Sequence, residues 1–170
     1  IKSRNIFRTV EKKVSDGSSS DLKIIEIRVE EQPTGEISAG AGIGTDGGSF
    51  AFNVQENNWL GQGKEIGLEF EVSSDSVKGN LSFTDPNYDL LGNSIRYSIE
   101  SDRNDKPDQG YENSIISAGI GTGFEQYKNV FTRLALYATH DDLRTNSSAS
   151  SSLQKQKGKF SELSGEYSFT

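Results

Sequence analysis

The sequence alternates apolar and polar residues over most of its length. In the stretch 66–72, for example, every second residue is Ile, Leu, Phe or Val, and the residues between are Gly or Glu. Successive side chains of a β-strand point to opposite faces, so this period of two predicts strands. From residue 35 onward we expect about eight strands, at 36–44, 49–57, 65–73, 77–84, 93–101, 112–123, 129–139 and 159–170. No helical pattern lies between them, which favours an all-β antiparallel meander joined by hairpins.

Residues 1–34 differ from the rest of the chain. Two runs rich in β-branched residues, 8–14 and 21–31, flank a turn signal at Asp16–Gly17. This pattern predicts a soluble β-hairpin that is charged on one face. We therefore expect two domains, with residues 1–34 ending in a linker and residues 35–170 forming the meander.

The predicted connections fall into two classes. The odd-numbered connections share one side of the meander and include two long polar loops, at 102–111 and 140–158. The even-numbered connections lie on the other side, are shorter and carry aromatic residues. Their turn and interface residues are Trp59, Leu60, Gly61, Pro86, Tyr88, Phe124 and Tyr127. Short turns with aromatic residues on one side and long polar loops on the other are typical of an outer-membrane β-barrel, whose short turns face the periplasm.

The two faces of the predicted strands leave two classes of protein open. A soluble antiparallel sandwich also alternates apolar and polar residues. Here, however, the polar positions carry charges that suit a water-filled barrel lumen: Glu69, Glu71, Arg96, Glu100, Arg133, Glu162 and Glu166. The apolar positions of the central predicted strands hold no Lys or Arg, either of which would cost roughly 2–4 kcal/mol at mid-bilayer. The pattern favours the membrane barrel over the sandwich.

Candidate catalytic chemistry is weak. A carboxylate-pair hydrolase needs two acids across a substrate, whereas the i, i+2 spacing of Glu69 and Glu71 only places both side chains on one face of a strand. His140 heads a predicted polar loop and is interpreted as a surface residue, and Ser147–Ser152 as a flexible loop tip. Gly40–Gly44 lacks the spacing of a dinucleotide fingerprint. We expect no enzyme activity, no metal and no cofactor.

Composition narrows the possible partners. The 170 residues carry a net charge of −7, with no Cys and a single His. An acidic chain is a poor nucleic-acid binder, and one His excludes a His-rich metal site. No stretch approaches the roughly 20 apolar residues of a membrane helix, but membrane β-strands do not need one. The chain opens without Met, so we interpret it as a fragment or a processed product.

Two stretches resemble a known family. Gln55–Gly63 (QENNWLGQG) and Ser82–Ile95 (SFTDPNYDLLGNSI) are similar to the BamA-type outer-membrane protein assembly factors. Asn5–Val14 is similar to the end of that family's periplasmic POTRA module, where a helix precedes two closing strands. Glu30–Thr45 resembles the junction into the first barrel strand. The resemblance implies the end of the last POTRA module followed by the first half of a sixteen-stranded barrel.

The resemblance also implies a function. Family members fold and insert other β-barrel proteins into the bacterial outer membrane through a lateral gate, without a catalytic side chain or a cofactor. The partners would be outer-membrane lipids, unfolded barrel clients, and periplasmic chaperones and accessory lipoproteins that bind the POTRA part in the periplasm. The gate strand would comprise Glu36, Ile37, Ser38, Ala39, Gly40, Ala41, Gly42, Ile43 and Gly44. A two-partner-secretion-type transporter and a stand-alone eight-stranded structural barrel are the alternatives.

The predicted gate strand combines alternation with many glycines. Ile37, Ala39, Ala41 and Ile43 would face lipid and the glycines the lumen, with a first turn at Thr45–Gly48. Each glycine weakens a strand by roughly 0.5–1 kcal/mol relative to alanine. We hypothesise that Gly40, Gly42 and Gly44 weaken the seam so that it can open. The competing explanation is that small residues face a crowded lumen.

Overall fold

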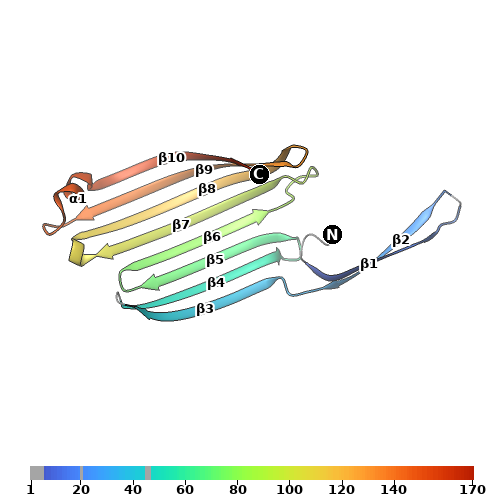
Figure 1. Ribbon diagram of the computed structural model, residues 1–170, viewed down its shortest axis with the longest axis horizontal. Helices are drawn as coiled ribbons and strands as arrows, with labels where there is room; N and C mark the ends of the chain where they lie inside the picture. Colours follow the sequence, from blue (N-terminus) through green and yellow to red (C-terminus); the bar gives the residue numbers. More distant parts are fainter. Residues whose placement is uncertain (1–5, 20, 45–46) are drawn as a thin grey trace.

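The chain forms a two-stranded hairpin and one broad antiparallel sheet (Figure 1). The structure is a computed structural model and describes residues 6–19, 21–44 and 47–170. Residue 5, the first of the stretch that resembles the end of a POTRA module, and residues 45 and 46 of the expected first turn lie outside these ranges. In the hairpin, β1 (Phe7–Asp16) pairs with β2 (Lys23–Glu31). The turn closes where the Gly17 amide donates to the Leu22 carbonyl at 2.9 Å.

The sheet has eight strands in sequence order, each paired with its chain neighbours. Its strands are β3 (Gly35–Gly44), β4 (Gly47–Trp59), β5 (Lys64–Ser73), β6 (Ser76–Asp85), β7 (Ser94–Lys106), β8 (Tyr111–Tyr127), β9 (Val130–Thr145) and β10 (Gly158–Phe169). The expected antiparallel meander is confirmed. In the described part of the chain β3 and β10 each have one neighbour, so the sheet is open and does not close as an eight-stranded barrel.

The two ends of the sheet differ in what they carry. We call the end at which the β1–β2 hairpin joins the hairpin end; it also holds the β4–β5, β6–β7 and β8–β9 turns (Figure 1). The opposite end, the loop end, holds the β3–β4, β5–β6, β7–β8 and β9–β10 connections. At the hairpin end the backbone amide and side-chain amide of Asn57 donate to the Thr34 carbonyl, at 3.2 and 3.0 Å. The segment expected to be a linker is therefore hydrogen-bonded to the sheet.

The two long loops at the loop end are shorter than predicted, because the neighbouring strands extend into them. Most of 102–111 belongs to β7 and β8, which leaves a short 3-10 helix at Pro107–Gln109 followed by Gly110 with φ +73°. Residues 140–145 continue β9. Backbone hydrogen bonds form a ladder whatever the side chains are, so a strand continues after its apolar alternation stops. That is why the sequence pattern ended too early.

The tip of the β9–β10 connection is also more structured than expected. The Ser150 hydroxyl caps helix α1 (Ser151–Gln156) by accepting from the Leu153 amide at 3.3 Å. Ala149 is buried, and the Asn146 amide donates to the Gly110 carbonyl at 2.9 Å. The predicted flexible tip thus packs on the neighbouring β7–β8 turn.

Cross-strand pairing separates the side chains into two faces. Directly paired residues of antiparallel strands share a face. One row crosses all eight strands with apolar residues only: Ile37, Val54, Leu68, Leu81, Ile99, Ala118, Ala138 and Leu163. The next residue along each strand gives a row of polar residues only: Ser38, Asn53, Glu69, Asn80, Glu100, Ser117, Thr139 and Glu162. We call the faces that carry these rows the apolar face and the polar face.

The sheet does not cover its apolar face. Among the described residues the only buried ones are Ile6, Gly63, Gly110, Thr132 and Ala149, and none of these lies in the apolar row. Leu81, Ile99 and Leu163 in that row are all exposed. A soluble sandwich would bury such a row between two sheets. Among the described residues there is also no helix that is long and apolar enough to cross a lipid bilayer.

Candidate lateral edge and polar face

The predicted gate strand is an edge of the sheet. β3 pairs with β4 along its whole length, from Gly35 opposite Glu56 to Gly44 opposite Gly47, and no strand of the described ranges pairs with its other side. Edge strands are normally protected by Pro, Lys or a bulge. β3 contains no Pro and no Lys, and its pairing with β4 has no register shift. Its backbone groups are thus presented as a regular template on which another strand can pair.

The side chains of β3 lie on the expected faces. Ile37 and Ile43 project from the apolar face and are 72% and 94% exposed. Ala39 and Ala41 share this face through their partners Phe52 and Phe50. The intervening residues of β3 lie on the polar face. They are Glu36, Ser38, Gly40, Gly42 and Gly44.

Among the described residues, packing requires glycine at neither Gly40 nor Gly44 of β3, whereas a Cβ on Gly35, at the start of the strand, would lie 2.6 Å from Glu56 Oε2. A Cβ built on Gly40 or Gly44 would have no heavy atom within 4 Å, and one on Gly42 would lie 3.3 Å from the Ser49 hydroxyl oxygen. Larger side chains therefore fit at Gly40 and Gly44 in the described sheet. Crowding by the other described strands does not explain these glycines.

Strand β8 repeats the glycine alternation in the middle of the sheet. Gly119, Gly121 and Gly123 occupy successive positions on its polar face. A Cβ on Gly119 would lie 2.7 Å from the Tyr137 ring, and one on Gly123 would lie 2.7 Å from the Ser94 hydroxyl oxygen. Alternating glycines therefore have a packing reason in β8, a central strand, whereas Gly40 and Gly44 of the edge strand β3 have none among the described residues.

All seven predicted lumen charges lie on the polar face. Glu69, Glu100 and Glu162 share the polar row defined above. Glu71 lies one row nearer the loop end, opposite Lys78. Toward the hairpin end, one row joins Arg96 to Glu166 through Gly121 and Ala135, and Arg133 lies in the next row. The pairing thus brings together residues that the sequence alone only assigned to one face of each strand.

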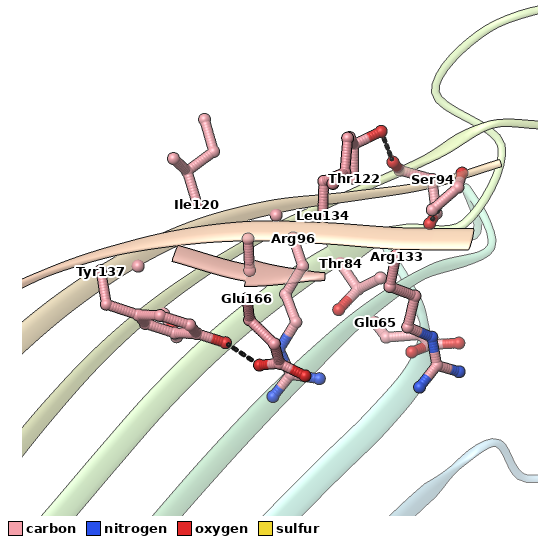
Figure 2. Close-up of a pocket in the computed structure, with 15 residues that line it drawn as sticks. Glu65, Thr84, Ser94, Arg96, Ile120, Thr122, Arg133, Leu134, Tyr137 and Glu166 are labelled. Atoms are coloured by element: carbon pink, nitrogen blue, oxygen red, sulfur yellow. Dashed lines mark hydrogen bonds between the residues drawn. The ribbon is translucent and has the colours of Figure 1, made fainter. Parts of the chain in front are cut away.

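A shallow hollow lies on the polar face near the hairpin end (Figure 2). It forms where the β8 glycines leave space. The side chains of Arg96, Arg133 and Glu166 line the hollow and extend from the same side of the sheet (Figure 2). The Tyr137 hydroxyl donates to Glu166 Oε2 at 3.4 Å. Two arginines and the carboxylates that line the hollow give it mixed charge, which suits a solvated channel wall.

The predicted turn residues all lie at the hairpin end. Trp59 ends β4, and Leu60 and Gly61 take left-handed conformations, with φ +55° and +71°. Pro86 and Tyr88 lie in the β6–β7 turn. The assignment of the last two residues, Phe124 and Tyr127, to a turn is wrong, because β8 runs to Tyr127. The connection shrinks to Lys128–Asn129, where Asn129 takes φ +64°.

One carboxylate organises the β6–β7 turn. Asp89 accepts hydrogen bonds from the Asn93 amide at 3.0 Å, the Leu91 amide at 2.9 Å and the Asn93 side chain at 2.6 Å. These bonds, with that from the Asn93 backbone the largest, hold the pKa of Asp89 below its ordinary value. The turn is thus fixed from within, although Leu90 and Leu91 are fully exposed or nearly so.

The structure adds three aromatic residues to this end that the sequence analysis did not single out. Phe131, Tyr167 and Phe169 are all exposed and lie at the hairpin-end termini of β9 and β10. The sequence pattern placed Tyr167 and Phe169 in the predicted strand 159–170, but did not show that they neighbour the aromatic turns. Tyr and Trp favour a membrane–water interface because their rings are apolar and their tips polar.

Neither face contains a metal site among the residues that the structure describes, since no group of three or more His, Cys, Asp or Glu converges there. His140 lies on the apolar face, where its Nδ1 is 3.0 Å from the Ser161 hydroxyl oxygen. The arrangement can offer a backbone edge, an apolar surface and a charged solvated wall. A sheet with these features is part of the wall of a transmembrane β-barrel.

Comparison with known proteins identifies the family. Residues 58–170 match the Omp85 superfamily domain. The chain therefore belongs to the Omp85 superfamily. The matched residues begin near the end of β4 and include all of β5 to β10.

A solved structure extends the likeness to the whole chain. The crystal structure of BamA from Haemophilus ducreyi lacking POTRA domains 1–3 superimposes with a TM-score of 0.70 and 25% sequence identity. The match covers 98% of this chain and 35% of that one, so this chain spans about a third of the length of that structure. The resemblance to BamA-type proteins is confirmed by these two findings.

Proposed function

We propose that this chain is the first part of a factor that inserts β-barrel proteins into the bacterial outer membrane. The observation that carries the proposal is the unprotected, regularly paired edge of β3 in a sheet of the Omp85 superfamily. In lipid every backbone N–H and C=O must find a partner within protein. A client strand that pairs on such an edge satisfies these groups as it leaves water.

In this proposal the apolar face contacts lipid and the polar face lines the lumen. The hairpin end faces the periplasm, where β1 and β2 form the end of a POTRA module that binds chaperones and accessory lipoproteins. The exposed apolar residues on one face of this hairpin, Val14, Ile25, Ile27 and Val29, are consistent with a module that has further elements to cover them. Clients would be unfolded barrel proteins.

The glycines of β3 give the proposed gate a physical basis. Each hydrogen bond of a seam contributes about 0.5–1.5 kcal/mol net in water. Glycine costs a strand conformational entropy, and Gly40 and Gly44 have open space around them. An edge that is weak by composition and not by crowding can release its partner strand and bend toward a client.

Reconstitution of the full-length protein tests the proposal. A denatured client barrel, diluted onto phospholipid vesicles that contain the full-length protein, should fold several-fold faster than on vesicles that contain a porin at the same density. The proposal requires no nucleotide, because the client's own burial and pairing drive the reaction. Equal client folding rates on the two kinds of vesicle would overturn it.

A further inference from the structure

The apolar face changes character toward the loop end of β7 to β10. The row Ser101, Ile116, His140 and Ser161 is followed by the row Arg103, Ser114, Asp142 and Lys159. The second of these rows continues through the pairing of Arg103 with Val77 onto β6 to β3, where it is apolar throughout: Val77, Val72, Phe50 and Ala41. The apolar band thus runs obliquely across the paired rows, as the strand tilt of a barrel requires. Its loop-end border on β7 to β10 is lined by charged residues.

In the Asp142 cluster at this border the cations are more exposed than the carboxylate, and the exposed carboxylate of Asp105 lies one row beyond Arg103, opposite Glu112. Arg144 Nη2 lies 2.8 Å and Lys159 Nζ lies 3.7 Å from the same atom, Asp142 Oδ2. The side chains of Arg144 and Lys159 are 65% and 67% exposed, whereas that of Asp142 is only 16% exposed. One covered carboxylate therefore holds two exposed cations. Because two positive charges share one negative charge, this cluster has a net positive charge.

A second ion pair extends the same surface. Arg103 Nη2 lies 2.7 Å from Glu112 Oε1, and again the cation is more exposed than the carboxylate. We call Arg103, Arg144 and Lys159 the basic border. On the described strands β3 to β6, the apolar face carries no Lys or Arg near the loop end. The basic border is therefore confined to one part of the wall.

The neighbouring sequence has the same charge. Residues 143–160 carry four cations, Arg144, Lys155, Lys157 and Lys159, and no carboxylate, in a chain of net charge −7. This segment is held in place by its own contacts: Gln154 Nε2 donates to the Ala149 carbonyl at 2.8 Å, and the Asn146 side chain accepts from the Ser148 amide at 2.8 Å. The cations are presented by an ordered hairpin.

The height of the basic border matches that of lipid headgroups. Successive residues on one face of a strand are about 7 Å apart. Lys159 is two such steps beyond Leu163 of the apolar row, and Arg103 is two steps beyond Ile99. The exposed cations thus stand roughly 14 Å along the strand from residues in the apolar row, which for strands tilted by about 40° is roughly 11 Å along the membrane normal. With the apolar row at mid-bilayer, this is close to the edge of the apolar band of an outer-membrane barrel, which is about 25 Å tall.

We propose that the basic border binds the phosphate groups of outer-leaflet lipids. Guanidinium and ammonium groups are the side chains that recognise phosphate, and Arg can do so with two parallel hydrogen bonds. The acyl chains of the same lipid would lie along Leu163, Ile116 and Ile99. The inference rests on the proposed placement of the sheet in the membrane, with the loop end outside.

Lipid binding by the purified full-length protein in detergent tests the proposal. Native mass spectrometry would count bound diphosphoryl lipid A, a glycolipid with two phosphates, and bound phosphatidylcholine. The variant carries Arg144→Gln and Lys159→Gln. The matched control is Lys78→Gln, because Lys78 Nζ also lies 3.7 Å from a carboxylate, Asp102 Oδ2, but on the polar face. A charge-conserving variant, Arg144→Lys with Lys159→Arg, controls for folding.

We expect the double Gln variant to bind the diphosphoryl lipid roughly thirtyfold less tightly, since two cations are lost and each cation near a charged lipid surface contributes about 1 kcal/mol. Phosphatidylcholine binding should not change, and the Lys78→Gln and charge-conserving variants should bind as the wild type. Equal loss in the Lys78→Gln variant, or no loss in the double variant, would overturn the inference. If millimolar inorganic phosphate displaced the bound diphosphoryl lipid, this result would also overturn the inference and would indicate a site for free anions. Client folding in vesicles is measured in a separate experiment. Failure of the proposed function would appear as slow client folding there, whereas failure of this inference would appear only in lipid binding.

Discussion

Tyr137 of β9 lies directly opposite Gly119 of β8, and its ring fills the space where a side chain on Gly119 would lie. The equivalent space beside Gly40 of β3 is open. The two glycines belong to similar stretches, Ile116–Gly119 and Ile37–Gly40, which both read ISAG. The same four residues therefore serve different physical purposes in a central strand and in an edge strand.

This contrast predicts opposite effects of adding one methyl group. Gly119→Ala should destabilise the folded protein by about 1–3 kcal/mol, because a Cβ would overlap the Tyr137 ring. Gly40→Ala should leave stability unchanged or raise it by up to about 1 kcal/mol, since alanine loses less backbone entropy. Urea unfolding of the full-length protein in vesicles measures both variants. Equal destabilisation would show that β3 is as crowded as β8.

The seam hypothesis predicts a loss of function without a loss of folding. Gly40→Val with Gly44→Val should stiffen the edge and slow client assembly about fivefold or more, since each glycine weakens the strand by roughly 0.5–1 kcal/mol. Ala39→Val with Ala41→Val adds similar bulk to the opposite face of the same strand. This control should assemble clients at the wild-type rate. Wild-type rates from the glycine variant would refute the hypothesis.

The two faces predict a matched pair of arginine substitutions. Leu81→Arg places a charge in the middle of the apolar row and should cost roughly 2–4 kcal/mol of stability in a bilayer. Asn80→Arg lies on the polar face between Glu69 and Glu100, which would compensate its charge. Stability is measured by urea unfolding in vesicles. If Asn80→Arg were the more damaging, the assignment of the faces would be reversed.

The β6–β7 turn should depend on pH. Because the folded-state pKa of Asp89 is lowered, its contribution to stability is present above the ordinary Asp pKa of about 3.9. This contribution is lost as the pH falls through the lowered value. Protection of the Leu91 and Asn93 amides from hydrogen exchange should therefore decrease at acidic pH in the wild type. In Asp89→Ala, protection should be weak at every pH, and a wild-type pH profile in that variant would contradict the assignment.

Much of the sheet could be predicted from sequence, because alternation is a local property. The faces of β3 and the charges from Glu69 to Glu166 were assigned correctly to a side of each strand. The ends of β7 and β9 were not, since Asp102–Lys106 and Asp141–Thr145 no longer alternate although their backbones still pair. The basic border was missed for the same reason: Arg103 and Arg144 lie in strand extensions that the sequence suggested were loops.

The meaning of the glycines could not be predicted either. Alternating glycines in β3 and β8 look the same along the chain, and only the partner strands distinguish them. The space beside Gly40 and the ring beside Gly119 depend on which residues lie opposite. Cross-strand neighbours in a hairpin are set by register, which depends on turn geometry, and the β8–β9 turn is shorter than the sequence pattern predicted.

Site-specific photocrosslinking during client assembly tests the central claim most directly. A photoreactive residue is placed at Ile37 on the open edge, or at Leu81, which lies in the same apolar row but in the middle of the sheet. Both side chains are exposed on the same face, so they differ in edge position and not in polarity. The account predicts that an assembling client crosslinks to position 37 and not to position 81. Equal crosslinking at both positions, or none at position 37 while clients fold, would contradict it.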